Sequence, residues 1–228
     1  MRVGAIDCGT NSIRLLIADS TTEVVDGVEK TVLKDVAREM RIVRLGQGVD
    51  ATGWLAQEAL DRTFAAAREY AQLLKEHGAD SVRFVATSAT RDAGNRQVFV
   101  DGIREILGIE PEVFSGQEEA RLSFTGSLLG AGADEGTPGA GERALAPRLV
   151  VDLGGGSTEL VLGVDEPSAA ISLDTGSVRI TERFLAGGVT PESEAAARAE
   201  VRGLLDEAER VVDLSAPGRL VGLAGTIT

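Results

Sequence analysis

Two carboxylates and a run of glycines lie close together in residues 149–164. Asp152 precedes and Glu159 follows the segment Gly-Gly-Gly-Ser at 154–157. Consecutive glycines let the backbone bring several N–H groups close to an anion such as phosphate, and Ser157 adds a hydroxyl donor. Two carboxylates beside a phosphate would repel it unless a hard divalent cation lay between them, and oxygen ligands of this kind suit Mg²⁺ or Mn²⁺. The stretch therefore predicts metal-assisted phosphoryl chemistry.

The start of the chain carries a near-copy of this stretch. Residues 5–18 align with residues 150–163 without a gap, so that Asp7 matches Asp152. Each copy is typical of a strand, a tight turn and a second strand. A repeat at so long a period is not that of a solenoid, whose units are much shorter. It predicts two related lobes that face each other across a cleft, each with one phosphate-binding turn.

Length, composition and charge agree with two small soluble lobes. The chain has 228 residues, and its 43% apolar content is enough for real cores. The sequence has no basic segment followed by an apolar signal region, and no apolar run approaches membrane-spanning length. A cytoplasmic location without a membrane partner is therefore expected. The net charge of −13 argues against nucleic-acid binding, because a polyanion surface normally has a basic footprint.

The single cysteine and the single histidine are both interpreted as structural residues. Cys8 cannot form an internal disulfide, which fits a reducing compartment. It lies in a predicted phosphate turn, but a small buried apolar residue is favoured over a reactive thiol. His77 falls at the predicted end of a helix, where capping is favoured over catalysis.

The rest of the chain alternates predicted strands with predicted helices. The strands are expected at 2–7, 12–19, 29–44, 82–86, 112–114, 169–173 and 219–223. The helices are expected at 53–77 and 95–107, from Ser115, at 175–185 and from Thr190. In the last helix a stripe at 3.6-residue spacing is expected to be core, namely Ala197, Val201, Leu204, Ala208 and Val211.

A segment rich in Gly and Ala at 130–147 predicts a flexible loop between the lobes. The expected lobes are therefore 1–124 and 125–228, with the boundary near 125–148. The chain stops directly after a strand turn. This predicts a second lobe that is incomplete at its C-terminus, or else a disordered or absent tail.

Two adjacent glutamates at the start of a predicted helix have different expected roles. Ser115 and Glu118 have capping-box spacing, in which each side chain accepts a hydrogen bond from the backbone N–H of the other residue. That gives Glu118 a structural role. Glu119 has no such explanation and points elsewhere from the same turn, so it is a candidate for the cleft. A solvated glutamate is the ordinary alternative.

Five motifs, in this order and spacing, resemble the exopolyphosphatase and guanosine pentaphosphate phosphohydrolase family. They are Asp-Cys-Gly-Thr-Asn-Ser at 7–12, Thr-Ser-Ala-Thr-Arg at 87–91, Ser-Gly-Gln-Glu-Glu-Ala-Arg at 115–121, Asp-Leu-Gly-Gly-Gly-Ser-Thr-Glu at 152–159 and Gly-Thr at 225–226. The resemblance covers the whole chain and implies the actin, sugar-kinase and heat-shock-ATPase fold, an α/β fold of two ribonuclease-H-like lobes around a cleft. It also implies Mg²⁺-dependent hydrolysis of a terminal phosphoanhydride bond.

The roles of site residues follow from the same resemblance. Glu119 matches the family's catalytic base, which agrees with the capping argument. Asp152 and Glu159 match its metal-associated carboxylates, and Asp7 is grouped with them. Phosphate contacts are implied for Asn11, Arg91, Gly154, Gly155, Gly156, Ser157, Gly225 and Thr226. The departures are mild: Thr10 stands where serine is commoner and Cys8 where an aliphatic residue is commoner.

Several alternatives stay open at this point. The motif at 7–12 also resembles the entry motif of sugar kinases, but an obvious sugar-site aspartate motif is missing. A non-catalytic sensor of guanosine pentaphosphate or tetraphosphate, reporting on starvation in the stringent response, is a further alternative that the presence of Glu119 disfavours. The choice between inorganic polyphosphate and guanosine pentaphosphate, the preferred chain length and the oligomeric state, with a homodimer as one option, are not decided by the sequence. Longer family members carry extra helical domains that help to bind substrate.

Overall fold

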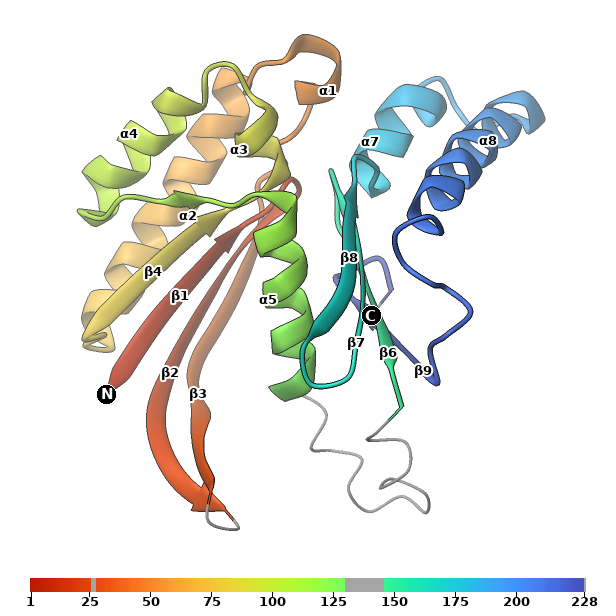
Figure 1. The fold of residues 1–228 in the computed structure, drawn as a ribbon. Coiled ribbons are helices and arrows are strands. Elements are labelled where there is room, and N and C mark those ends of the chain that lie inside the picture. The colour runs from red at the N-terminus through yellow and green to blue at the C-terminus, as the bar shows by residue number, and fades with distance from the viewer. Residues whose placement is uncertain (26–27, 130–145, 228) are drawn as a thin grey trace. The chain divides into compact units, whose positions relative to one another are not determined.

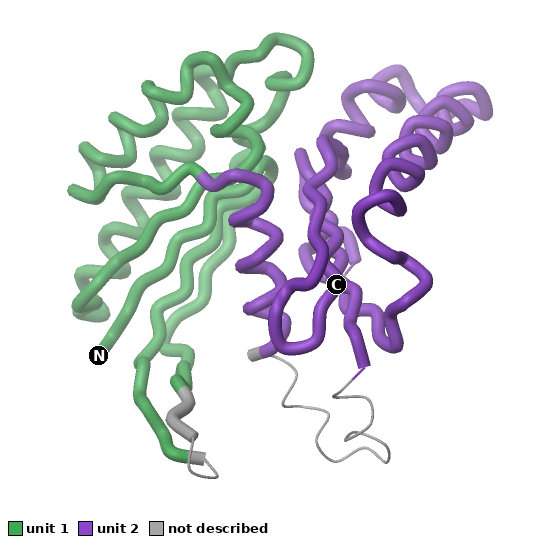
Figure 2. The backbone as a smooth tube through the Cα atoms, in the orientation of Figure 1, with its two compact units in different colours: residues 1–113 green, residues 114–228 purple. Residues whose placement is uncertain are grey.

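The computed structural model describes residues 1–25, 28–129 and 146–227. The chain divides into two compact units, unit 1 at Met1–Val113 and unit 2 at Phe114–Thr228, which Figure 2 shows in different colours. This division lies earlier than the boundary at 124/125 expected from the sequence. Each unit is a mixture of helices with one β-sheet, as the sequence predicts.

Unit 1 is built on a five-stranded sheet with the order β3-β2-β1-β4-β5 (Figure 1). Strand β1 pairs antiparallel with β2 and parallel with β4. The strands are β1 (Arg2–Cys8), β2 (Ser12–Val25), β3 (Val28–Ile42), β4 (Ser81–Ala86) and β5 (Glu112–Val113). All five strands predicted for this part of the chain are confirmed, with ends that differ by a few residues.

Two long helices of unit 1 cover the core of its sheet. They are α2 (Gln57–Glu76) and α4 (Arg96–Leu107), and the short helices are α1 (Val49–Thr52) and α3 (Ser88–Asp92). Tyr70, Phe84 and Phe99 are fully buried between α2, α4 and the sheet. The helix expected at about 53–77 is confirmed as α2 but begins only at Gln57, because Gly53 has a φ of 73° and ends α1 instead. His77 caps the C-terminus of α2 as predicted, and its N–H donates to the Leu73 carbonyl at 2.9 Å.

Unit 2 is built on a four-stranded sheet with the order β8-β7-β6-β9. The strands are β6 (Arg148–Leu153), β7 (Thr158–Gly163), β8 (Pro167–Leu173) and β9 (Arg219–Leu223). The helices are α5 (Gly116–Leu129), α7 (Ser177–Ile180), the π-helix η2 (Thr181–Leu185) and α8 (Pro191–Ala208). Thr190 caps the N-terminus of α8 in a capping box shared with Ser193, so the helix start expected at Thr190 is confirmed.

The two faces of the unit 2 sheet carry different helices. Ala120 and Phe124 of α5 pack against Val150 and Val161 on one face. On the other face, Leu149, Leu160 and Leu162 of the sheet form a cluster with residues from the end of α8 onward, including Ala208 and Val212. Because α5 fills one face of this sheet, it belongs to unit 2, and this explains why the division of the chain lies earlier than expected. An amphipathic pattern identifies a buried helix face but not the sheet that covers it.

Other sequence predictions fare differently. Val211, predicted to continue the buried stripe of α8, is 52% exposed, because the helix ends at Ala208 and the chain turns so that Val212 is buried instead. Of the predicted loop at 130–147, residues 130–145 lie outside the described part of the chain. Among the described residues, no helix is both long and apolar enough to cross a membrane.

The internal repeat is confirmed in the connectivity of the two sheets. Strands β1, β2 and β4 of unit 1 are paired in the same way as β6, β7 and β9 of unit 2. The turns close with the same hydrogen bond: the Gly9 N–H donates to the Ser12 carbonyl at 3.0 Å, and the Gly154 N–H donates to the Ser157 carbonyl at 3.1 Å. Asp7 and Asp152 therefore lie at equivalent strand ends of the two units.

Candidate active site

The two predicted metal carboxylates of unit 2 face each other across a pair of strands. Asp152 of β6 and Glu159 of β7 are direct partners in the antiparallel ladder, so their Cβ atoms lie on one face of the sheet at roughly 4.5–5.5 Å. Glu159 is only 1% exposed. Like charges directly opposite each other destabilise a sheet, and a buried carboxylate is costly without partners. The pair therefore requires groups that stabilise its negative charge.

Two serine hydroxyls stabilise this pair. The Ser172 hydroxyl of β8 donates to Glu159 Oε1 at 2.8 Å. The Ser123 hydroxyl of α5 donates to Asp152 Oδ2. A hydrogen bond to an ionised carboxylate is stronger than one between neutral groups. Each carboxylate thus has one oxygen fixed by a hydroxyl from a neighbouring element.

In unit 1, the position equivalent to Glu159 carries a positive charge instead of a negative one. Asp7 of β1 is the ladder partner of Arg14 in β2, where unit 2 pairs Asp152 with Glu159. Opposite charges at directly facing ladder positions attract, whereas like charges repel. The pairing of two carboxylates in this ladder position is therefore a property of unit 2, and the role of Asp7 as a metal ligand stays a prediction.

Glu119 lies on the same side of α5 as Ser123, which bonds Asp152, and Gly116, which packs on the Glu159 partner Ser172. Its neighbours on that side are Gly116, three residues earlier, and Ser123, four residues later. Ser123 bonds Asp152, and Gly116 packs so closely on Ser172 that an added Cβ would lie 2.5 Å from the Ser172 Cβ. Glu119 is partly buried. The helix therefore holds the predicted base on the face that covers the carboxylates.

The neighbouring glutamate has the structural role expected from the sequence. The Ser115 N–H donates to Glu118 Oε2 at 2.8 Å, and the Glu118 N–H donates to the Ser115 hydroxyl at 3.3 Å. These are the two reciprocal bonds of a capping box. The capping box predicted for Ser115 and Glu118 is confirmed, and Glu118 is exposed where Glu119 is partly buried.

The glycine turn of unit 2 is anchored through its carbonyl groups. The Gly154 carbonyl accepts from the Ser177 N–H at 3.0 Å, and the Gly155 carbonyl accepts from the Val178 N–H at 2.9 Å. The Gly156 carbonyl accepts from Nε of Arg179 at 2.9 Å. The first amides of α7 are thus directed at the turn.

Because the carbonyl groups of the turn bond to α7, its backbone N–H groups are directed to the opposite side. The described peptide bonds are trans, and in a trans peptide the C=O and the following N–H point in opposite directions. The N–H groups of Gly155, Gly156 and Ser157 therefore point away from α7. Adjacent N–H groups directed to one side form the kind of concavity that binds phosphate. The Ser157 side chain is only 2% exposed, and its role as a hydroxyl donor stays a prediction.

Replacing Gly176 by alanine is expected to weaken binding of phosphate-type anions. An added Cβ would lie 2.5 Å from both the carbonyl carbon and the oxygen of Gly155, which are backbone atoms that cannot swing aside. Overpacking of about 1–3 kcal/mol would displace the turn. The expected result is an apparent KM for inorganic tripolyphosphate raised by about 10-fold, because 1.4 kcal/mol corresponds to that factor.

Gly203 provides the matched control for this change. An alanine at Gly203, in the middle of α8, would meet nothing within 4 Å and should stabilise the helix slightly. If Gly176→Ala left the KM unchanged, as Gly203→Ala should, the turn would not be the phosphate site.

The remaining predicted phosphate contacts lie at strand ends of both units. Gly225 and Thr226 follow β9, whose last residue Leu223 pairs with Asp152, so this exposed turn lies at the same sheet edge as the glycine turn. In unit 1, the Asn11 carbonyl accepts from the Val43 N–H at 3.0 Å.

Arg91 is brought to the same edge of unit 1 as Asn11. It lies in α3, directly after β4, and its side chain is 23% exposed with Nε 3.7 Å from Asp92 Oδ1. A buried hydroxyl bond of 2.9 Å between Thr10 and Ser88 ties the Asn11 turn to α3. Asn11 and Arg91, the two residues of unit 1 predicted to contact phosphate, therefore lie at the same end of its sheet.

The donor set of unit 2 suits a magnesium ion that is shared with substrate. In the described residues, no group of three or more Asp, Glu, His or Cys side chains forms a complete cage. Mg²⁺ is commonly held by one or two carboxylates together with substrate phosphates and waters. Asp152 and Glu159 are the candidates for those two carboxylates. The residues therefore fit Mg²⁺ in a site completed by phosphate.

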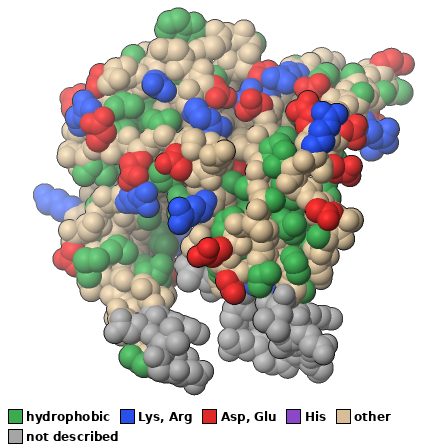
Figure 3. Space-filling view, viewed as in Figure 1, with side chains coloured by type: hydrophobic (Ala, Val, Ile, Leu, Met, Phe, Trp, Pro, Cys, Tyr) green, Lys and Arg blue, Asp and Glu red, His purple; other side chains and the backbone are tan. Residues whose placement is uncertain are grey.

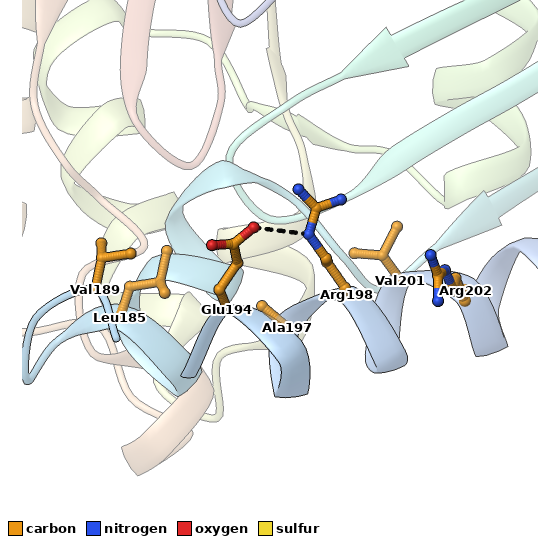
Figure 4. Close-up of a pocket in the computed structure, with 7 residues that line it drawn as sticks. All are labelled: Leu185, Val189, Glu194, Ala197, Arg198, Val201 and Arg202. Carbon is orange, nitrogen blue, oxygen red and sulfur yellow. Dashed lines mark hydrogen bonds and ion pairs between the residues drawn. The ribbon is translucent and has the colours of Figure 1, made fainter. Parts of the chain in front are cut away.

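Neither Cys8 nor the apolar cavity of unit 2 adds chemistry to this site. Cys8 is 1% exposed, and burial raises the pKa of its thiol, so it is inert at neutral pH, as the sequence predicts. A cavity of about 340 Å³ lies between η2 and α8 (Figure 4). Its lining is mostly apolar. Of its charged residues, Arg198 donates from Nε to Glu194 Oε1 at 2.8 Å.

Sequence reasoning missed four residues that organise this site. Ser123 and Ser172 hold the carboxylates, and Gly176 and Arg179 hold the glycine turn. Ser123 could have been found from its i, i+4 spacing to Glu119. Ser172 could not, because its partner follows from the register of β7 and β8.

Comparison with known proteins shows the family of the chain. The family model for the Ppx/GppA phosphatase family matches residues 23–228. The chain is 51% identical over 233 residues to Exopolyphosphatase 2 of Mycobacterium tuberculosis, covering 100% of this chain and 69% of that protein. It is also 33% identical to a bifunctional 3-dehydroquinate synthase/phosphatase of Fusobacterium nucleatum, covering 98% of this chain and 33% of that protein.

Solved structures give the same assignment. The crystal structure of an exopolyphosphatase-like protein matches 100% of this chain and 67% of its own, with 45% identity and a TM-score of 0.85. An exopolyphosphatase from Cytophaga hutchinsonii matches 99% of this chain and 67% of its own, with 29% identity and a TM-score of 0.79. The family match covers most of the chain and includes the carboxylates, the glycine turn and Glu119. The chain belongs to the Ppx/GppA phosphatase family.

Proposed function

We propose that this protein hydrolyses the terminal phosphoanhydride bond of inorganic polyphosphate with the help of Mg²⁺. The observation that carries the proposal is the position of Glu119, on the side of α5 where Ser123 bonds Asp152 and Gly116 packs on Ser172, the hydroxyl partner of Glu159. The 51% identity to a protein named Exopolyphosphatase 2 supports the choice of substrate. Membership of a phosphatase family argues against the sugar-kinase alternative.

The proposed reaction needs a base, an anion cradle and a source of positive charge. Glu119 accepts a proton from water as the water oxygen bonds to the terminal phosphorus. The bridging P–O bond breaks at the same centre, releasing orthophosphate and a chain shorter by one phosphate. The amides of the 154–157 turn hold the phosphoryl oxygens, and positioning of this kind supplies most of the catalysis in phosphoryl transfer.

A metal would complete this arrangement. Mg²⁺ held by Asp152 and Glu159, when bound, supplies positive charge that stabilises the phosphoryl oxygens. Mn²⁺ has the same ligand preference and is expected to substitute. Asn11 and Arg91 of unit 1 are proposed to contact phosphate as well, because the turn of unit 1 closes with the same hydrogen bond as the glycine turn of unit 2.

Guanosine pentaphosphate ends in the same phosphoanhydride and is the alternative substrate. The experiment that separates the candidates measures orthophosphate release from short polyphosphate, long polyphosphate, guanosine pentaphosphate and ATP in parallel, with and without Mg²⁺. Release from polyphosphate only with Mg²⁺ is expected. Binding of guanosine pentaphosphate without any phosphate release would instead favour the sensor, against which the presence of Glu119 argues.

Short polyphosphate is expected to be a better substrate than very long chains. The net charge is −13, and acidic side chains are interspersed with basic ones on the face shown in Figure 3. Such a surface gives little long-range attraction for a polyanion beyond the site. The measurement is kcat/KM as a function of chain length. An efficiency that rises steadily with length would contradict this prediction.

A further inference from the structure

The carboxylate pair in unit 2 is held by hydroxyl groups from two different elements. Ser172 of β8 donates to Glu159 Oε1 at 2.8 Å, and Ser123 of α5 donates to Asp152 Oδ2. A hydrogen bond to one carboxylate oxygen restricts rotation of the whole carboxylate group. It therefore also sets the direction of the second oxygen of the same carboxylate.

The strand register makes this restriction necessary. Asp152, Glu159 and Ser172 are successive ladder partners across β6, β7 and β8, so the two carboxylates lie side by side on one sheet face. Like charges at this spacing repel and would rotate apart. Glu159 is 1% exposed and has little solvent to stabilise a rotated position. The serines oppose that rotation at both carboxylates.

Helix α5 connects both hydroxyls to the base. Gly116 packs on Ser172 so closely that an added Cβ would lie 2.6 Å from its Oγ. Ser123 lies about two turns further along the helix, and Glu119 lies between these residues on the same side. Helix α5 thus carries Glu119 together with Ser123, which bonds Asp152, and Gly116, which packs on Ser172.

We propose that Ser123 and Ser172 are positioning residues that set the spacing of the Asp152 and Glu159 carboxylates for a divalent cation, in register with Glu119. This inference rests on the proposed function, because it assigns the cation to that site. Removal of either hydroxyl should weaken cation binding without removing a ligand. Loss of an interaction that orients a metal ligand typically costs about 10–100-fold in affinity.

The test measures cation binding directly. Mn²⁺ binding to the full chain, followed by electron paramagnetic resonance without substrate, is compared for wild type, Ser172→Ala and Ser123→Ala. We expect the Mn²⁺ dissociation constant to rise by about 10–100-fold in each variant. Ser123→Thr keeps the hydroxyl on the helix and should restore wild-type affinity. Thermal unfolding of each variant checks that it is folded.

Ser168→Ala is the matched control on the same strand. The Ser168 hydroxyl donates to the Leu162 carbonyl at 2.9 Å, away from the carboxylates, so its loss should alter stability but not Mn²⁺ affinity. If Ser172→Ala and Ser123→Ala behaved like Ser168→Ala while the wild type bound Mn²⁺ and released phosphate, this inference would be wrong and the proposed function would stand. Ser123 lies on a partly buried helix face, so its variants provide the answer even if Ser172→Ala fails to fold. A wild type without Mn²⁺ binding or Mg²⁺-dependent phosphate release would overturn both.

Discussion

Replacing Glu119 by glutamine is expected to lower turnover by roughly 10²–10⁴-fold, as is typical for loss of a general base. Glutamine keeps the size and hydrogen-bonding capacity of the side chain but cannot accept the proton of the attacking water. Substrate binding should persist or tighten, because one negative charge near a polyphosphate is removed. The measurement is the rate of orthophosphate release at saturating substrate, together with a binding constant for the same substrate.

Glu118→Gln is the control for this change. Glu118 accepts from the Ser115 N–H at 2.8 Å, and glutamine also serves in a capping box. This variant should keep nearly full stability and rate. The two variants differ by one position on the same helix turn, so they separate catalysis from helix capping. Inactivity of Glu118→Gln with full activity of Glu119→Gln would show that the base and the cap are assigned the wrong way round.

Replacing Glu159 by glutamine or Asp152 by alanine is expected to raise the Mg²⁺ concentration needed for half-maximal activity. Each change removes a carboxylate from the cation, so the effect should exceed the roughly 10–100-fold seen when only an orienting partner is lost. Glutamine at Glu159 preserves the volume of a side chain that is 1% exposed, so packing is retained. The measurement is activity titrated against Mg²⁺ for each variant.

A structural role for Asp152 makes a different prediction. If Asp152 only held α5 through Ser123, its replacement would lower the unfolding temperature, and the surviving enzyme would keep the wild-type Mg²⁺ requirement. An unchanged Mg²⁺ requirement in both variants would show that Asp152 and Glu159 do not bind the metal.

The strand and turn elements of the site were predictable because their determinants are local in sequence. The segment 154–157 and its copy after Asp7 contain their own turn-forming residues, and both close with the predicted tight geometry. The cap that separates Glu118 from Glu119 needs only three residues of spacing. The closure of both turns and the capping box at Ser115, which rest on such short-range chemistry, are confirmed.

The parts that could not be predicted depend on pairings between distant segments. The sequence assigned α5 to the first lobe, because its pattern does not reveal that Phe124 packs on β6 and β7. The sequence does not distinguish Ser172 from other polar residues, because only the register of β7 and β8 places it beside Glu159. Gly176 matters only because α7 docks on the glycine turn. Each of these relations is a tertiary contact rather than a sequence pattern.

The most direct test of the account is orthophosphate release from tripolyphosphate in isotopically labelled water, with and without Mg²⁺, by the wild-type protein and by Glu119→Gln. We expect that the wild type releases orthophosphate only with Mg²⁺ and that each released phosphate carries a single labelled oxygen from water. Glu119→Gln is expected to release roughly 10²–10⁴-fold less under the same conditions. Release without label, or equal release by wild type and Glu119→Gln, would contradict water activation by Glu119.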